Sequence, residues 1–256
     1  MWNWLNPEDP IFAIDQVEGE EAQFERMREL WDRNSDHNPL VSSDFFCGGF
    51  KEAFERNGER IARYLEAKLD LDAAARVLDL GAGIGRIARY LAEGSERYVL
   101  ADVSGQMLER ARTRVGAGRA ELARLVDNRL PWTDASFTHC IAIDVVQHLP
   151  ERTLRAYFLE VSRLLVPGGR LLLTSGASSG ADTPPDPQAS RQLLRLLNLK
   201  PLPFGARTGP VLAELIADRQ LRLREQGDNF PNLLPMLPIQ VPFAGSYLLF
   251  EKRSDV

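Results

Sequence analysis

Three glycines at alternating positions, Gly81, Gly83 and Gly85, follow a mostly apolar run at residues 77–80. Glycine adopts the positive φ angles of a tight turn without steric cost, and it lets backbone N–H groups come close to a ligand. The stretch therefore predicts a buried strand, a sharp turn and the start of a helix that carries Ile87. This arrangement favours an α/β fold with a ligand at the turn, and the motifs that follow in register decide the matter.

The spacing of these glycines separates two kinds of nucleotide site. A dinucleotide-binding turn reads G-x-G-x-x-G, and its third glycine would fall at position 86, where this chain has Arg86. Asp79 stands two residues before the first glycine, where a carboxylate would repel a pyrophosphate and attract an ammonium group. The pattern favours a nucleoside that carries an amino acid. A dinucleotide-binding or nucleotide-sugar domain is the alternative.

Short apolar runs alternate with amphipathic runs from residue 76 to residue 175, which is typical of βαβ units and a parallel sheet. The strongest helix pattern covers residues 154–165, and we expect Pro167, Gly168 and Gly169 to end that helix and turn the chain into a strand. The expected strands are residues 77–80, 98–101, 122–126, 137–143, 170–174, 221–225 and 246–251.

The two flanks differ from this central part. We predict a helical cap or lid at residues 1–75 and the ligand-binding domain at residues 76–256. The cap should dock on the domain, because three of the four tryptophans lie in it and an apolar stripe leads into the first strand. The tryptophans are Trp2, Trp4 and Trp31, and the stripe is Phe50, Phe54, Ile61, Leu65 and Leu69.

Residues 230–243 are rich in large apolar side chains but contain four prolines, so they predict neither a helix nor a central strand. Such a segment must be covered. Packing within the chain, a homodimer contact and a roof over an apolar substrate are the three interpretations.

Composition excludes several classes. The net charge of −5 gives no general attraction to nucleic acid or to an anionic membrane. Cys47 and Cys140 form no C-x-x-C pair, and His37, His139 and His148 have no metal-ligand spacing, so we expect neither disulfides nor a metal site. The N-terminus lacks the pattern of a signal peptide, and no apolar run is long enough to span a bilayer. We therefore expect a cytoplasmic protein.

Acidic residues recur where successive strands should end. Asp102 closes the second predicted strand, where a carboxylate can accept hydrogen bonds from both hydroxyls of a ribose. Asp127 and Asn128 follow the third strand, where a carboxylate can accept from the amino group of an adenine. These positions are in register with the glycine turn.

In this order the motifs VLDLGAGIGRIARYL, ADVSGQMLERAR, LVDNRLPWTDASF, IDVVQHLP and VSRLLVPGGRLLLTS resemble those of class I S-adenosylmethionine-dependent methyltransferases, particularly the small-molecule branch. The resemblance covers about residues 76–175. It implies a Rossmann-like seven-stranded, mostly parallel sheet in the order 3-2-1-4-5-7-6, with the seventh strand antiparallel, and S-adenosylmethionine as the cofactor.

The resemblance also implies roles for individual residues. Asp79, Gly81 and Gly83 would line the methionine part of the cofactor, Asp102 would hold the ribose, and Asp144 would face the methyl group. The remaining residues expected to bind the cofactor are Ala82, Arg86, Val103, Met107, Asp127 and Asn128.

Two residues keep alternative interpretations. Arg86 is either a surface residue of a helix or a guanidinium that binds the cofactor carboxylate, as in the protein α-N-terminal methyltransferases, whose turn the run GAGIGRI resembles. His148, after the fourth strand, is either a general base or a packing residue, and Asp144 is the second catalytic candidate.

The leading functional hypothesis is methyl transfer to an oxygen or nitrogen atom of a small-molecule acceptor, which could have an apolar part. Methylation of a protein N-terminus is the first alternative. It is disfavoured because residues 173–176 lack the carboxylate that those enzymes carry at the end of the fifth strand. A non-catalytic cofactor-binding subunit is the second.

Overall fold

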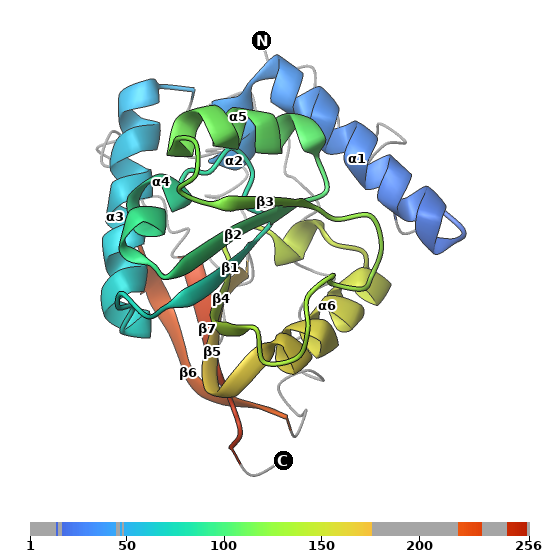
Figure 1. Ribbon diagram of the computed structural model, residues 1–256. Coiled ribbons are helices and arrows are strands. Elements are labelled where there is room, and N and C mark those ends of the chain that lie inside the picture. The colour runs from blue at the N-terminus through green and yellow to red at the C-terminus, as the bar shows by residue number, and fades with distance from the viewer. Residues whose placement is uncertain are drawn as a thin grey trace, which may run out of the picture.

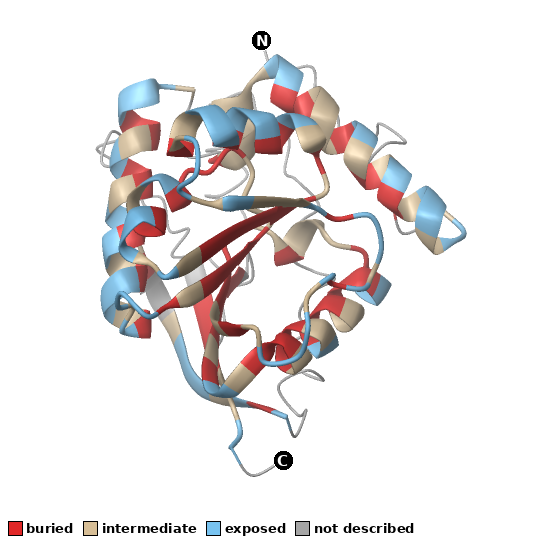
Figure 2. Ribbon diagram, viewed as in Figure 1, coloured by how far each residue is buried: buried red, intermediate tan, exposed pale blue. Residues whose placement is uncertain are grey.

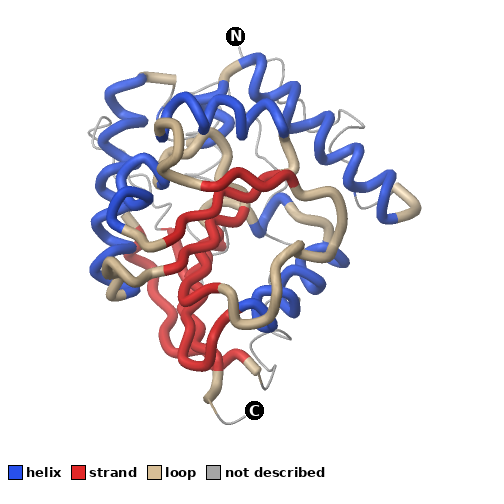
Figure 3. Tube along the Cα trace, in the orientation of Figure 1, coloured by secondary structure: helices blue, strands red, loops and turns tan. Residues whose placement is uncertain are grey.

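A computed structural model describes residues 14, 17–44, 47, 49–175, 220–231 and 245–254. Its centre is a seven-stranded sheet in the order β3-β2-β1-β4-β5-β7-β6 (Figures 1 and 3). β7 pairs antiparallel with both β5 and β6, and the other neighbouring strands are parallel. The predicted fold class, strand order and antiparallel seventh strand are confirmed.

The elements follow one another in the expected alternation. The helices are α1 (Glu20–His37), α2 (Pro39–Ser43), α3 (Lys51–Leu69), α4 (Ala88–Leu91), α5 (Gly105–Val115) and α6 (Glu151–Leu164), with 3-10 turns η4 (Ala92–Gly94) and η5 (Val146–His148). The strands are β1 (Arg76–Leu80), β2 (Arg97–Asp102), β3 (Glu121–Arg124), β4 (Phe137–Ala142), β5 (Leu165–Ser175), β6 (Leu221–Phe230) and β7 (Gly245–Lys252).

Alternate residues of the strands face two separate apolar layers, because side chains along a strand point to opposite sides. Leu78 and Val99 pack in one layer with α1 and α6. Val77 and Leu100 pack in the other with α3, α4 and α5. Figure 2 shows the central strands buried between helices whose outer faces are exposed. The helices packed on both faces of the sheet therefore fix the positions of the carboxyl ends of its strands.

The start of β5 differs from the prediction. The strand begins at Leu165, which pairs with Phe137 of β4, and it runs through Pro167, Gly168 and Gly169. These residues do not end the helix, because α6 already stops at Leu164. They bend the strand instead: Gly168 has a φ of 79° and the register shifts between Phe137 and His139.

The predicted stripe of the cap is correct except at its first residue. Phe54, Ile61, Leu65 and Leu69 are buried, whereas Phe50 is 63% exposed because it precedes the first turn of α3. The division of the chain into a cap and a domain stays a prediction. Trp2, Trp4 and most of the predicted apolar segment at 230–243 lie outside the described residues. No helix among the described residues is long and apolar enough to cross a membrane.

Candidate functional site

The glycine turn connects β1 to α4, and each of its three glycines has a positive φ. At Gly81 a Cβ atom would lie 2.4 Å from Cγ2 of Val145, and at Gly85 it would lie 2.8 Å from Cγ2 of Val115. The N–H groups of Gly81 and Ala82 both donate to the carbonyl of Ala101 on β2, at 2.7 and 3.2 Å. Both sterics and backbone angles therefore demand glycine here.

Asp102, at the end of β2, holds the same turn with its carboxylate. It accepts from the backbone N–H of Gly83 at 2.8 Å and from that of Ser104 at 2.9 Å. Burial raises the pKa of Asp102 to about 6, and the hydrogen bonds from Ser104 and Gly83 oppose this rise. A carboxylate has about four lone-pair sites, so two accepted bonds leave it further capacity.

Asp79 is a second buried carboxyl group beside the turn, and it is 4% exposed. The hydroxyl of Tyr98 donates to it at 3.0 Å. Burial raises the pKa of Asp79 to about 7; the Tyr98 hydrogen bond lowers it, the charge of Asp102 raises it and that of Arg86 lowers it. Two neighbouring carboxylates that are costly to ionise favour a cationic ligand group.

Arg86 is 4% exposed, so the surface-helix interpretation is wrong. Its guanidinium lies 2.8 Å from Oδ2 of Asp44 and 3.1 Å from Oδ2 of Asp144. Asp44 also accepts from the Asn57 amide at 3.0 Å, and the N–H of Asp144 donates to the Thr174 hydroxyl at 2.8 Å. We call these five residues the Arg86 cluster.

Sequence reasoning missed three members of this cluster. Asp44 and Asn57 belong to the predicted cap, and Thr174 lies near the end of β5. Their spacing along the chain carries no signal, because only the fold brings them together. The sequence does predict Asp144 as a site residue, and its φ of 60° is a strained value for a residue other than glycine.

The residues predicted to contact the adenine lie next to the first residue of α1, Glu20. Asp127 is exposed, and its carboxylate accepts from the N–H of Arg129 at 2.8 Å. The N–H of Asn128 donates to Oε1 of Glu20 at 2.9 Å. The cap therefore reaches this edge of the sheet, a contact that sequence reasoning also missed.

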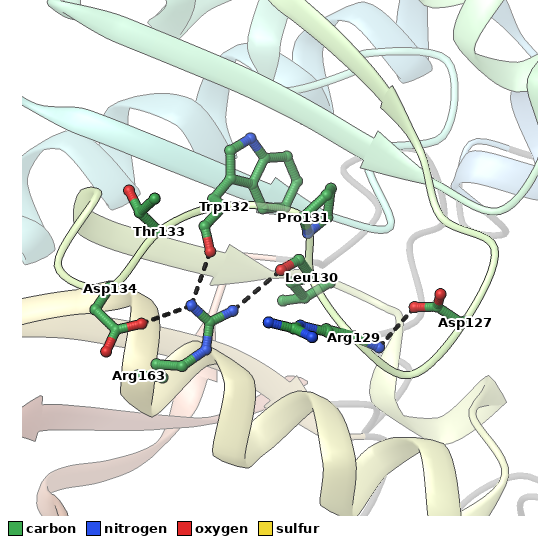
Figure 4. A pocket seen from close by; sticks show the side chains of 8 residues that line it. All are labelled: Asp127, Arg129, Leu130, Pro131, Trp132, Thr133, Asp134 and Arg163. Atoms are coloured by element: carbon green, nitrogen blue, oxygen red, sulfur yellow. Dashed lines mark hydrogen bonds and ion pairs between the residues drawn. The ribbon is translucent and has the colours of Figure 1, made fainter.

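An open hollow lies beside Asp127, between the loop that leads into β4 and helix α6 (Figure 4). The guanidinium of Arg163 crosses it and donates to the carbonyls of Leu130 and Trp132 and to the carboxylate of Asp134. These bonds fix the loop to α6, so the role of Arg163 here is structural.

The remaining candidates lie among apolar side chains. Met107 is 2% exposed and packs with Val41 and Phe54 of the cap, whereas Val103 packs against the layer that contains α1 and α6. The ring of His148 meets the ring of Trp31 edge-on at 5.1 Å between centroids. Burial lowers the pKa of His148 to about 4.

The described residues contain no group of side chains that could hold a metal ion, and Cys47 and Cys140 are both free and buried. Burial raises the pKa of Cys47 to about 11 and also raises that of Cys140, so neither thiol is reactive near neutral pH.

Comparisons with known proteins agree with this geometry. Residues 77–169 match the family model described as a methyltransferase domain. Methyltransferase GfsG of Streptomyces halstedii is 38% identical over 121 residues, which are 45% of this chain and 43% of that protein. O-methyltransferase resE of Aspergillus sclerotiorum is 28% identical over 193 residues, which are 73% of this chain and 69% of that protein.

Residues 77–169 thus form a class I S-adenosylmethionine-dependent methyltransferase domain. The predicted family and cofactor are thus confirmed. Among solved structures, this methyltransferase chain is similar to phosphoethanolamine N-methyltransferase 1 of Haemonchus contortus, with a TM-score of 0.67 and 16% identity. That likeness covers 92% of this chain and 50% of the other, and at this identity it concerns the fold alone.

Proposed function

We propose that this methyltransferase transfers a methyl group to an oxygen or nitrogen atom of a small-molecule acceptor. The observation that carries the donor half of the proposal is the pair of buried carboxyl groups, Asp79 and Asp102, on either side of the glycine turn. When bound, S-adenosylmethionine supplies a methyl group on a positively charged sulfur.

The residues around the turn fit the parts of that cofactor. Asp79 would bind the α-ammonium group, which compensates the cost of its buried charge. Asp102 would accept from the ribose hydroxyls with its remaining lone pairs. The buried guanidinium of Arg86, held by Asp44 and Asp144, would donate to the α-carboxylate.

At the other end, Asp127 and Asn128 would contact the adenine, with Ala82, Val103 and Met107 along the same path. Methyl transfer from a sulfonium needs mainly alignment and exclusion of water, and proximity alone can supply about 7–11 kcal/mol. Asp144 would face the methyl group. His148 would pack against Trp31 rather than act as a base, because its pKa of about 4 makes it a weak proton acceptor.

The nature of the acceptor is supported by a second observation. Near the end of β5 the chain has Thr174, whose hydroxyl bonds Asp144, where a carboxylate would favour a protein N-terminus as acceptor. The similarity to O-methyltransferase resE supports an oxygen atom as the methyl acceptor. An apolar part of the acceptor and a homodimer, both inferred from residues 230–243, stay predictions.

The acceptor can be found with methyl-labelled S-adenosylmethionine and a fractionated extract of the organism that makes the protein. We expect label in low-mass compounds that depends on the active protein. Label on protein N-termini instead would favour the first alternative. Binding of the cofactor without any labelled product would favour the non-catalytic subunit.

A further inference from the structure

Ser43, the last residue of α2, lies directly over the glycine turn. A Cβ atom at Gly83 would be only 2.9 Å from the Ser43 hydroxyl oxygen. The next residue in the chain, Asp44, contacts the guanidinium of Arg86. The cap therefore places one hydroxyl group at the turn and one carboxylate at the arginine behind it.

The Ser43 hydroxyl oxygen is buried and has no hydrogen-bond partner among the described residues. The neighbouring Ser42 differs, since its hydroxyl lies 3.0 Å from the carbonyl of Asn34 and 2.8 Å from that of Asn38 within the cap. Buried hydroxyl groups are nearly always paired, so an orphaned one beside a ligand-binding turn indicates a missing partner.

The charges around the turn indicate which part of a ligand that partner is. Asp79 and Asp102 lie on the strands, where they suit an ammonium group and ribose hydroxyls. Arg86 is the positive group on the cap side, where its guanidinium already contacts the carboxylates of Asp44 and Asp144. A hydroxyl and a guanidinium together suit a carboxylate.

We propose that Ser43 donates a hydrogen bond to the α-carboxylate of the cofactor, so that the cap and Arg86 share one carboxylate site. The proposal rests on the proposed function, since it names a further contact to the same cofactor. It gives the cap a direct role in holding the methyl donor, and it links docking of α2 to occupancy of the turn.

The test compares two ligands that differ in one group. S-adenosylhomocysteine has the carboxylate, and S-adenosyl-3-thiopropylamine lacks only that group. Calorimetry should show that Ser43→Ala weakens binding of the first ligand by about tenfold, which is about 1.4 kcal/mol, and leaves the second unchanged. Ser43→Cys, which keeps the side-chain size but is a poor donor, should give the same selective loss.

Ser42→Ala is the matched control, because it removes a hydroxyl of the same helix that is already paired with the carbonyls of Asn34 and Asn38. The ratio of its affinities for the two ligands should equal that of the wild type. Equal losses for both ligands in the Ser43 variants, or no loss for either, would overturn the proposal. If the wild-type protein binds neither ligand, the proposed function itself is wrong, and the two failures are thereby distinguished.

Discussion

The glycine turn and the Arg86 cluster lie side by side, but they are held in different ways. The turn is fixed by its own backbone angles and by two hydrogen-bond acceptors on the neighbouring strand, the carbonyl of Ala101 and the carboxylate of Asp102. The cluster is fixed mainly by side chains from distant parts of the chain, with Asp44 and Asn57 on one side and Asp144 and Thr174 on the other.

This difference teaches where each region is vulnerable. Backbone geometry resists side-chain changes but tolerates no added Cβ atom. In the Arg86 cluster only Asp144 has an unusual backbone angle. The cluster depends instead on the compensation of every buried charge. We therefore expect opposite kinds of substitution to damage the two regions.

The largest effect should come from Arg86→Met, which leaves Asp44 and Asp144 without their buried cation. Breaking a buried pair in this way costs about 3–5 kcal/mol. Urea unfolding should show a loss of this size. Arg155→Met is the control, because the Arg155 and Glu151 side chains are 37% and 62% exposed, and such a surface pair is worth about 0.3–0.5 kcal/mol. Similar losses in both variants would contradict the account.

Gly81→Ala should be the next most damaging change. Its φ of 72° costs an alanine about 1 kcal/mol, and the contact with Val145 adds about 1–3 kcal/mol of overpacking. Gly105→Ala is the matched control, since a Cβ there meets nothing within 4 Å and the residue opens α5. Thermal unfolding should separate the two. Equal stability would show that the turn does not depend on glycine.

The ionisation of Asp79 should appear as pH dependence of ligand binding. With a pKa of about 7, Asp79 is increasingly protonated as pH falls, and a neutral carboxyl group attracts an ammonium group poorly. Affinity for S-adenosylhomocysteine should rise between pH 6.5 and 8, and Asp79→Asn should remove the rise. A slope that persists in this variant would assign the titration to another group.

The same pKa has a consequence for the free protein. A carboxyl whose pKa is raised on folding contributes stability that is lost as pH rises toward 7. The Asp79→Asn variant should therefore be more stable than the wild type at pH 8 when no ligand is present. Denaturant unfolding at pH 5 and pH 8 measures this directly.

The smallest effect concerns His148. Its pKa is lowered on folding to about 4, so stability should fall as pH decreases from about 6.5, because the unfolded chain takes up the proton first. His148→Ala should remove this dependence and cost about 0.5–1.5 kcal/mol through the lost contact with Trp31. His37→Ala, an exposed residue of the same cap, is the control. A loss of kcat of about 100-fold, with stability unchanged, would support the general-base alternative.

The two regions also differ in how far the sequence predicts them. Gly81, Asp79 and Asp102 lie at fixed distances along the chain, because strands and turns impose local periods, and the strand order follows from the family that these motifs indicate. Ser43, Asp44 and Asn57 have no such period. Their partners lie across the fold, so only packing of the cap reveals them.

Local sequence patterns gave the wrong boundary at two places, the start of β5 and the start of α3. The run Pro167–Gly169 predicts the end of a helix, but pairing of Leu165 with Phe137 starts the strand earlier. Phe50 fits the spacing of the apolar stripe, but α3 begins only after it, and the side chain is left exposed. In both places tertiary contacts decide what the local pattern leaves open.

Calorimetry with S-adenosylhomocysteine and NAD tests the central claim most directly, because the two ligands demand different chemistry at the glycine turn. We predict micromolar-range binding of S-adenosylhomocysteine and no measurable binding of NAD. Asp102→Ala should weaken the former by about 1–3 kcal/mol, since the ribose hydroxyls lose their acceptor. Tighter binding of NAD, or S-adenosylhomocysteine binding unaffected by Asp102→Ala, would contradict the account.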